Sequence, residues 1–330
     1  MMTDPSTRQS ADRRMVVAAA QLGPVQLEES RESAVTRLVT MLRTAAARGA
    51  EFVVFPELAF TTFFPRWWNE DQDEVDARFF ESSMPSPDTQ PLFDTARDLG
   101  VGFYVGYAEL VPADQSPDGR TRRFNTAILV APNGEIIGKY RKIHLPGHAD
   151  HKPEAAFQHL EKRYFEVGDL GFPVYRFMDA LVGMLICNDR RWPEAYRVLG
   201  LQGAEMVTLG YNTPTENLHY PEPPAQRVAQ HLLMAQAMAY QNAVWVVQSA
   251  KAGFENGFRM FGNSVIVAPT GEVVAKTTSE DDEVIVHDCD LSLGDDLRRT
   301  MFNLEAHRRP EHYGLIVERT GVRITPANEI

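Results

Sequence analysis

Short apolar runs alternate with amphipathic segments along the whole chain. Several runs have the length and composition of buried β-strands: residues 15–21, 51–55, 101–110, 182–187, 206–210 and 244–248. Other segments have the pattern of α-helices: residues 28–48, 89–99 and 225–242. A further helix is expected to begin near Trp192, after the strand that ends at residue 187. This alternation predicts an α/β fold in which helices cover β-sheets.

Two segments of the chain resemble one another. Residues 125–139 and residues 263–276 both begin with Asn and end with Lys, with alternating apolar residues around Pro-Asn-Gly or Pro-Thr-Gly. Each segment has the pattern of a β-hairpin. We infer two similar halves, each with its own sheet, packed against one another; a chance pair of hairpins is the alternative. Because no linker separates the halves, we expect a single domain over residues 13–330.

Composition narrows the class of protein. The chain has 330 residues and a formal net charge of -12, with no basic stripe, which argues against nucleic-acid and membrane-surface binding. No apolar stretch is long enough to span a bilayer. Residues 1–12 are polar and predict a flexible tail and not a signal peptide. Two cysteines cannot form a disulfide framework, so we expect a reducing, cytoplasmic location.

Cys187 ends one of the predicted buried strands. The polar turn after it leads to the helix expected near Trp192. Open α/β sheets bind ligands at this kind of place, the carboxyl end of a strand. Backbone N–H groups of the turn would lower the pKa of the thiol and could hold an oxyanion. Taken alone, however, a free cysteine is more often part of the core.

Three charged residues could complete a nucleophilic site with Cys187. Glu57 directly follows an apolar strand, where a buried carboxylate needs a partner; Lys142 follows the first hairpin, and Glu161 lies further along. Each alone is typical of a solvent-exposed charge. Together they supply a base for the thiol, a cation for the thiolate and oxyanion, and a carboxylate that holds the cation. Composition and spacing do not select these four residues unaided.

A resemblance to a known family does select them. Val-Val-Phe-Pro-Glu57, Lys-Tyr-Arg-Lys142-Ile-His-Leu and Ile-Cys187-Asn-Asp-Arg-Arg-Trp-Pro-Glu, in this order, resemble the three signatures of the nitrilase (carbon–nitrogen hydrolase) superfamily. Within that superfamily, the chain is similar to N-carbamoyl-D-amino-acid amidohydrolases over several segments: residues 63–67, 141–148, 157–166, 187–194 and 210–215. The similarity runs from about residue 15 to about residue 314.

The resemblance implies a role for each of these residues. Glu57 would be the base, Lys142 the cationic stabiliser, Cys187 the nucleophile and Glu161 the second glutamate near them. The implied reaction converts N-carbamoyl-D-amino acids to D-amino acid, ammonia and carbon dioxide through a thioester, with no cofactor and no metal. The resemblance also implies a set of substrate-binding residues: Arg190, Arg191, Asn188, Asn212, Thr213, His144, His159 and His231. Guanidinium groups are well suited to a substrate carboxylate.

The resemblance also implies a fold and an assembly. It predicts a four-layer α-β-β-α sandwich of two similar halves, with residues 300–330 as an arm. Helices would join copies into a homo-oligomer, a dimer or tetramer, and a small-molecule substrate would be the other partner. Residues 217–230 are rich in Pro and Glu and depart from the family pattern. The preference for the substrate side chain is therefore the property that this segment would change.

Other interpretations stay open. A cluster of histidines could hold zinc, although Pro146 and Gly147 interrupt it: His144, His148, His151 and His159. A non-catalytic scaffold is a second alternative. Within the superfamily, the alternative is an amidase or ureido hydrolase acting on N-carbamoyl-β-amino acids, carbamoylated amines or aliphatic amides. Cys289 has no basic or helical neighbour and is predicted to pack in the core.

Overall fold

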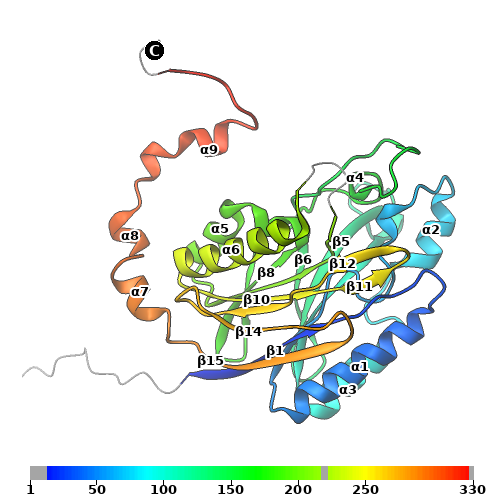
Figure 1. Cartoon of the computed structure of the whole chain (residues 1–330), viewed down its shortest axis with the longest axis horizontal. Coiled ribbons are helices and arrows are strands. Elements are labelled where there is room, and N and C mark those ends of the chain that lie inside the picture. The colour runs from blue at the N-terminus through cyan, green and yellow to red at the C-terminus, as the bar shows by residue number, and fades with distance from the viewer. Residues whose placement is uncertain (1–12, 217–221, 327–330) are drawn as a thin grey trace, which may run out of the picture.

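The computed structural model describes residues 13–216 and 222–326, so the expected N-terminal tail lies outside the described residues. The described chain forms two large sheets covered by helices (Figure 1). The first sheet contains, in order, β15 (Glu283–Asp290), β1 (Arg14–Gln21), β2 (Phe52–Val54), β4 (Gly102–Val111), β5 (Arg122–Val130) and β6 (Ile136–Arg141), with β3 (Phe80–Glu81) beside β4. The second contains β14 (Val273–Lys276), β13 (Val265–Val267), β10 (Trp245–Ala250), β9 (Met206–Tyr211), β8 (Ala180–Ile186) and β7 (Val174–Phe177).

The two halves of the chain repeat one pattern. In the first half, β1, β2 and β4 are parallel and the hairpin β5–β6 follows them. In the second half, β8, β9 and β10 are parallel and the hairpin β13–β14 follows, after the separate hairpin of β11 (Ala252–Glu255) and β12 (Phe258–Phe261). The prediction of two similar halves, each with the hairpin read from the repeat, is confirmed.

The last strand of each half belongs to the sheet of the other half. β7 ends the first half and pairs antiparallel with β8. β15 ends the second half and pairs antiparallel with β1 along its whole length, from Arg14 opposite Asp290 to Gln21 opposite Glu283. The sequence pattern does not predict this exchange. The exchanged strands join the halves through backbone hydrogen bonds as well as through side-chain packing.

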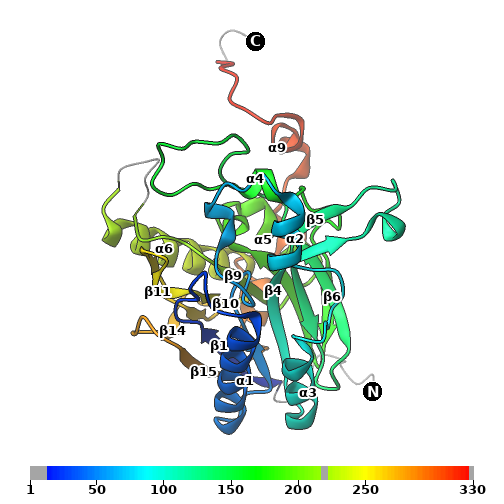
Figure 2. The same ribbon diagram turned by 90° about the vertical axis from the view of Figure 1, so that its right-hand side faces the viewer.

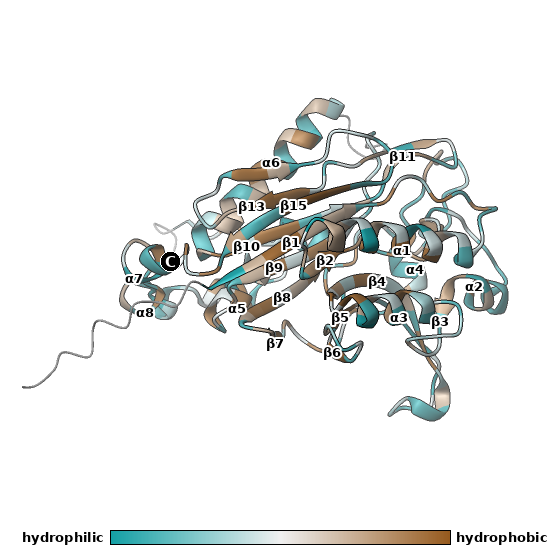
Figure 3. Ribbon diagram, turned by 90° about the horizontal axis from the view of Figure 1, so that it is seen from below, coloured by the Kyte–Doolittle hydropathy of each residue, from teal (hydrophilic) through white to brown (hydrophobic). Residues whose placement is uncertain are grey.

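Helices cover the outer face of each sheet (Figure 2). α1 (Arg31–Ala47) and α3 (Gln90–Leu99) pack on the first sheet, and α5 (Pro193–Leu201) and α6 (Pro224–Asn242) pack on the second. The strands between these helix layers are mostly hydrophobic, whereas the exposed helix faces are polar (Figure 3). The predicted four-layer α-β-β-α sandwich is confirmed. A further helix, α2 (Gln72–Phe79), follows the loop after β2.

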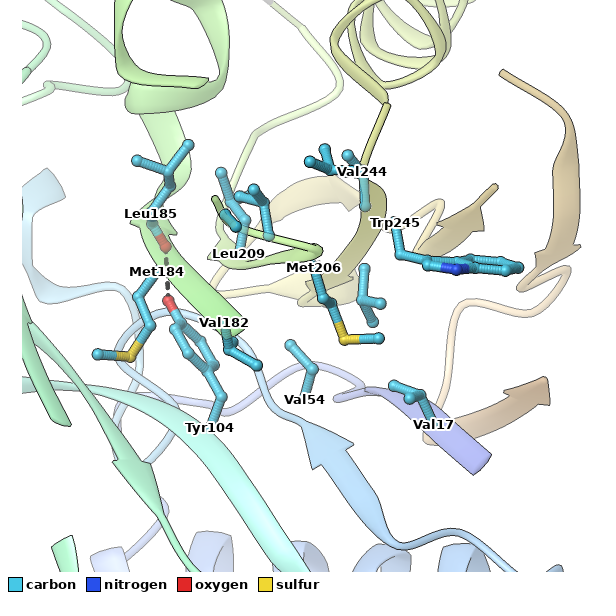
Figure 4. Close-up of a cluster of buried hydrophobic side chains, with 14 of the residues drawn as sticks. Val17, Val54, Tyr104, Val182, Met184, Leu185, Met206, Leu209, Val244 and Trp245 are labelled. Atoms are coloured by element: carbon cyan, nitrogen blue, oxygen red, sulfur yellow. Dashed lines mark hydrogen bonds between the residues drawn. The ribbon is translucent and has the colours of Figure 1, made fainter. Parts of the chain in front are cut away.

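The main core lies between the two sheets (Figure 4). Val17 and Val54 of the first sheet and Val182 and Met206 of the second belong to one fully buried cluster. Each such side chain stabilises the fold by roughly 1.5–3 kcal/mol through burial. Tyr104 crosses this layer: its hydroxyl donates to the Leu185 carbonyl at 2.8 Å and accepts from the Gly210 N–H at 3.1 Å. A buried tyrosine hydroxyl thus has both partners that it needs.

The C-terminal segment leaves the layered body (Figure 1). After β15 the chain forms α7 (Asp295–Arg299), α8 (Leu304–His307) and α9 (Gly314–Glu318). Apolar side chains on this segment are exposed, with Val317 at 88% and Val322 at 97%. The structure describes the expected arm as far as residue 326. Its apolar side chains are exposed and do not pack against the sheets. No helix among the described residues is long and apolar enough to cross a membrane.

Candidate active site

The ends of several strands meet at one edge of the two sheets. Glu57 follows β2, Lys142 follows β6, Cys187 follows β8 and Asn212 follows β9. Parallel strands place their carboxyl ends at one edge, which is why residues far apart in the chain come together. Glu161 joins them as the first residue of the short helix α4 (Glu161–Tyr164). All the predicted catalytic residues are buried, with Cys187 the most exposed at 4%.

Lys142 lies between two buried carboxylates. Its Nζ is 2.7 Å from Oε1 of Glu57 and 2.5 Å from Oε2 of Glu161. Asn125, on β5, donates its side-chain N–H to Glu57 Oε1 at 2.8 Å and reaches Glu161 Oε2 at 3.5 Å. An ammonium has three protons, so two hydrogen bonds to the carboxylates leave one proton of Lys142 for a further acceptor.

Burial and charge act in opposite directions on this cluster. Burial disfavours the charged form of Lys142, but the carboxylates of Glu161 and Glu57 and the thiolate form of Cys187 outweigh burial and raise the pKa of Lys142 above the usual value. Burial and the neighbouring Glu57 raise the pKa of Glu161 to about 7, although Lys142 opposes this shift. Lys142 is therefore a permanent cation, and Glu161 changes its charge near neutral pH.

Cys187 and Glu57 share Asn212 as a neighbour. The Asn212 N–H donates to Glu57 Oε2 at 3.0 Å, and the Cys187 thiol lies 3.5 Å from the Asn212 carbonyl oxygen. Cys187 has a φ of 47°, a left-handed conformation that costs a non-glycine residue roughly 1–2 kcal/mol. The surrounding hydrogen bonds hold the residue in this conformation, at the start of a 3₁₀ turn over Cys187–Arg191.

The structure corrects one expectation about the thiol. The turn was expected to lower the pKa of Cys187, but burial, followed by the charge of Glu57, raises it. Lys142 and Arg190 act in the opposite direction and do not overcome burial. The resting group is consequently a neutral thiol that needs a base to become a nucleophile.

The adjacent arginines have different environments. Arg190 is 2% exposed; it donates to the Cys187 carbonyl at 2.8 Å and to Thr213 Oγ1 at 2.9 Å, and its Nη1 is 3.7 Å from the Cys187 sulfur. Its guanidinium also stacks on the ring of Tyr211.

Arg191 is exposed and donates to Asn188 Oδ1 at 3.1 Å. The positive charge of Arg190 lowers the pKa of Arg191 to about 10.

The sequence interpretation missed Asp189, which is fully buried. Its Oδ2 accepts from the Ile186 N–H at 3.0 Å and from the Tyr140 hydroxyl at 2.8 Å. Its Oδ1 accepts from the His144 N–H at 3.0 Å and lies 2.7 Å from the His144 ring nitrogen Nδ1. Asp189 thus joins the turn that carries Cys187 to the segment that carries Lys142.

Asn125 was also missed as a site residue. It is the first residue of the internal repeat, and its counterpart Asn263 accepts a hydrogen bond from Tyr211 at 2.9 Å through its carbonyl. A polar residue kept at the start of both copies was a signal that could have identified it.

Two glycines allow the backbone of Glu57 to lie between the sheets. A Cβ atom on Gly210 of β9 would lie 2.4 Å from the Glu57 nitrogen, and one on Gly106 of β4 would lie 2.7 Å from the Glu57 Cα. Both obstacles are backbone atoms, which cannot rotate away. Glycine at these positions is therefore a steric requirement of the site.

The histidines named from the resemblance lie in different places. His144 is bound to Asp189 and lines a cavity of about 320 Å³ with Asn188 and Trp192. His159 packs against the Phe157 ring, with centroids 4.9 Å apart. His231, on α6, is buried with its Nε2 3.1 Å from the Tyr211 hydroxyl. Of these three, His231 alone lines the cavity formed by the arginines.

A cavity of about 270 Å³ is connected to the site through Arg190, which lines the cavity and contacts Cys187. It is lined by Arg190, Arg191, Thr213, Glu222, Arg227, Gln230, His231, Met234 and Phe261. Burial and the charge of Arg190 hold the pKa of His231 well below its usual value, so this histidine is neutral. Within residues 13–216 and 222–326, no group of three or more His, Cys, Asp or Glu side chains is arranged to hold a metal ion.

Comparisons with known proteins show the family of the chain. A family model described as carbon-nitrogen hydrolase matches residues 16–299. A protein named nitrilase from Pyrococcus abyssi (strain GE5 / Orsay) is 33% identical over 303 residues, covering 90% of this chain and 98% of that protein. The N-carbamoylputrescine amidase of Arabidopsis thaliana is 28% identical over 321 residues, covering 94% and 97%. The crystal structure of a carbon-nitrogen hydrolase from Helicobacter pylori G27 matches with a TM-score of 0.78 at 23% identity, covering 93% of this chain and 99% of that chain.

The class of protein follows from the fold and these relatives: it is a hydrolase that acts on carbon–nitrogen bonds. The chain belongs to the carbon–nitrogen hydrolase (nitrilase) superfamily. The substrate expected from the sequence, an N-carbamoyl-D-amino acid, is narrower than this class.

Proposed function

We propose that this protein hydrolyses N-carbamoyl-D-amino acids to the D-amino acid, ammonia and carbon dioxide. The observation that carries the choice of substrate is the arginine-lined cavity, one of whose arginines, Arg190, contacts Cys187. Guanidinium groups bind carboxylates through paired, charge-assisted hydrogen bonds. The D configuration rests on the resemblance of residues 187–194 to the carbamoylase pattern.

The same cavity distinguishes this proposal from its main alternative. N-carbamoylputrescine, named for the Arabidopsis relative, carries an ammonium group in place of a carboxylate. Arg190, Arg191 and Arg227 would repel that cation, since like charges a few ångströms apart are unfavourable even near a protein surface. An acidic substrate complements the cavity, whereas a carbamoylated amine does not.

In the proposed mechanism, Glu57 takes the proton of the Cys187 thiol, and the sulfur attacks the ureido carbonyl carbon. The carbonyl π electrons move to the oxygen, and the remaining proton of Lys142 stabilises that oxyanion together with the Asn188 N–H. Glu57 returns the proton to one of the two nitrogens, which leaves and gives a thioester on Cys187. Glu161 keeps Lys142 in position between the carboxylates.

Water completes the reaction. Glu57 removes a proton from a water molecule, whose oxygen attacks the thioester, and the Cys187 sulfur leaves and is reprotonated. The carbamic acid that is released decomposes to carbon dioxide and the second nitrogen product. The overall reaction is the same whether ammonia or the amino acid leaves first: the substrate and one water give the amino acid, ammonia and carbon dioxide.

The test is a substrate panel on the purified protein. It compares N-carbamoyl-D-amino acids, their L enantiomers, N-carbamoylputrescine and an aliphatic amide, with ammonia release as the readout. We expect the highest kcat/KM for D-configured N-carbamoyl amino acids, and no turnover by Cys187→Ala. Faster hydrolysis of N-carbamoylputrescine or of the amide would refute the proposed substrate but leave the superfamily assignment intact. Retained activity after dialysis against a chelator would argue against a catalytic zinc.

We also propose that the protein works as a homo-oligomer. Apolar side chains on the C-terminal arm are exposed, and so is Leu233 on α6 at 66%. The arm exposes the consecutive apolar residues Leu315, Ile316 and Val317, and contiguous exposed apolar groups are typical of association surfaces. Sedimentation equilibrium of the full chain, and of a chain ending at residue 299, tests this: a monomeric full chain would contradict it.

A further inference from the structure

We infer that the substrate's side chain is itself anionic, so that the preferred substrates are N-carbamoyl amino acids with a side-chain carboxylate. This inference rests on the proposed function and concerns the same cavity. Arg227, on α6, was not among the residues expected to bind substrate. It lies in the segment that departs from the family pattern, which is where a difference in specificity would arise.

The first argument is the charge of the cavity. Its described lining residues include three arginines and one carboxylate, Glu222, with His231 neutral. The described lining residues therefore carry two more positive charges than negative charges. The α-carboxylate of a substrate balances one of them, and a second carboxylate balances the other. A neutral side chain would leave the cavity with an excess of positive charge, whereas a second carboxylate neutralises it.

The second argument is an unpartnered donor. The Arg227 side chain is 10% exposed, and its Nε is 3.1 Å from Glu222 Oε1. Its Nη1, however, is buried without a hydrogen-bond partner. Glu222 therefore binds one edge of the guanidinium and leaves a donor free. A substrate carboxylate would accept from this donor, which a side chain without an acceptor cannot do.

The third argument is the arrangement of the arginines relative to the sulfur. Arg190 contacts Cys187 directly, and Arg191 follows it in the chain. In an N-carbamoyl amino acid the α-carboxylate is the nearer acid to the ureido carbon, so it suits Arg190 and Arg191. Arg227 reaches the same cavity from another element, α6, and suits a group at the end of the side chain. The cavity volume of about 270 Å³, slightly below the range of about 300–1,000 Å³ for drug-sized ligands, suits a small substrate.

The experiment uses isosteric substrate pairs. N-carbamoyl-D-aspartate is compared with N-carbamoyl-D-asparagine, and N-carbamoyl-D-glutamate with N-carbamoyl-D-glutamine, by kcat/KM on the wild-type protein. We expect at least one acid to exceed its amide about tenfold or more, the effect of one charge-assisted hydrogen bond. Ratios near or below one in both pairs would overturn the inference while leaving the proposed function in place. Turnover of no N-carbamoyl-D-amino acid, including alanine, would overturn both.

Variants identify the residue responsible. Arg227→Gln should bring the acid-to-amide ratio close to one, and Glu222→Gln should keep it or raise it. Arg197→Gln is the matched control, because Arg197 lies on α5, donates to the Gln241 carbonyl and does not line the cavity. It should leave the wild-type ratio unchanged. If a folded Arg227→Gln protein keeps the wild-type acid-to-amide ratio, the assignment of Arg227 is wrong. If Arg227→Gln does not fold, the same ratio measured for Arg227→Lys and for the wild-type protein tests the inference.

Discussion

Gly210 of β9 lies against the backbone nitrogen of Glu57, close enough that an added Cβ would be 2.4 Å from it. Gly210→Ala would therefore push Glu57 away from Lys142 or separate the sheets. We expect a loss of at least about 3 kcal/mol in the free energy of unfolding, as for severe overpacking, and a large fall in kcat. Urea denaturation and steady-state kinetics measure both. Gly200→Ala, in α5, is the control and should be neutral or stabilising, because its Cβ meets only a side chain, Asn242, at 3.3 Å.

Cys187 and Cys289 should respond differently to substitution and alkylation. Cys187→Ala should reduce kcat by several orders of magnitude without unfolding the protein, as expected when a nucleophile is removed. Cys289→Ala should keep activity, because Cys289 is fully buried in β15. Iodoacetamide should inactivate the enzyme by labelling Cys187, as read by peptide mapping. Inactivation with the label on Cys289 alone would contradict the assignment.

The raised pKa of Glu161 predicts that the stability of the fold depends on pH. Its pKa is about 7 in the folded protein and 4.5 in a free side chain, so the native state binds more protons between these values. Its contribution to stability is complete below pH 4.5 and is lost as the pH rises through 7, on the order of 3 kcal/mol. Thermal unfolding of wild type and Glu161→Gln should show the variant gaining relative stability over this interval. Glu154→Gln, at an exposed site, should follow the wild-type curve.

Substitutions of Arg190 and Arg191 should have different effects on stability and on substrate binding. Arg190→Gln removes buried hydrogen bonds to Cys187 and Thr213, so we expect about 3 kcal/mol less stability and a lower kcat. Arg191→Gln, at an exposed position, should change stability by less than about 0.5 kcal/mol but raise KM for carboxylate substrates. Hydrolysis of an uncharged amide by the Arg191 variant should change little. Equal effects of the two substitutions on stability would show that this distinction is wrong.

Asp189 should affect catalysis indirectly, because it positions the turn that carries Cys187 relative to the segment that carries Lys142. Asp189→Asn replaces an acceptor by a group that also donates, next to the Tyr140 hydroxyl and the Ile186 N–H. We expect kcat to fall about 10- to 100-fold with a smaller change in KM, since the turn that holds Cys187 is displaced from the Lys142 segment. The rate of Cys187 alkylation should change as well. A loss of stability with unchanged kcat and alkylation would indicate a purely structural role.

The sequence predicted those features that depend on local pattern. The hairpins at residues 125–139 and 263–276 follow from alternation around a turn, and the boundaries of β1, β4 and α6 lie within a few residues of their predicted ranges. The pairing of β15 with β1 could not be read in this way, because hydrophobic alternation indicates a strand but not its partner.

The site was predictable only in part, for a similar reason. Arg190 and Arg191 are neighbours in the sequence, yet the 3₁₀ turn directs the first inward and the second to solvent. Their roles differ because of a local rotation that residue types do not encode. Likewise, a buried aspartate such as Asp189 is identified only when its donors from Tyr140 and Ile186 are brought to it by the fold.

The exchange of β7 and β15 between the sheets has a consequence for splitting the chain. Glu57, Asn125 and Lys142 belong to the first half, and Cys187 and Asn212 to the second. Two polypeptides divided at the β7–β8 turn, near Asp179, would each hold an incomplete reaction centre and a strand that fits only the other's sheet. Such fragments should be inert alone and recover hydrolysis on mixing, so that enzymatic activity becomes a reporter of fragment complementation.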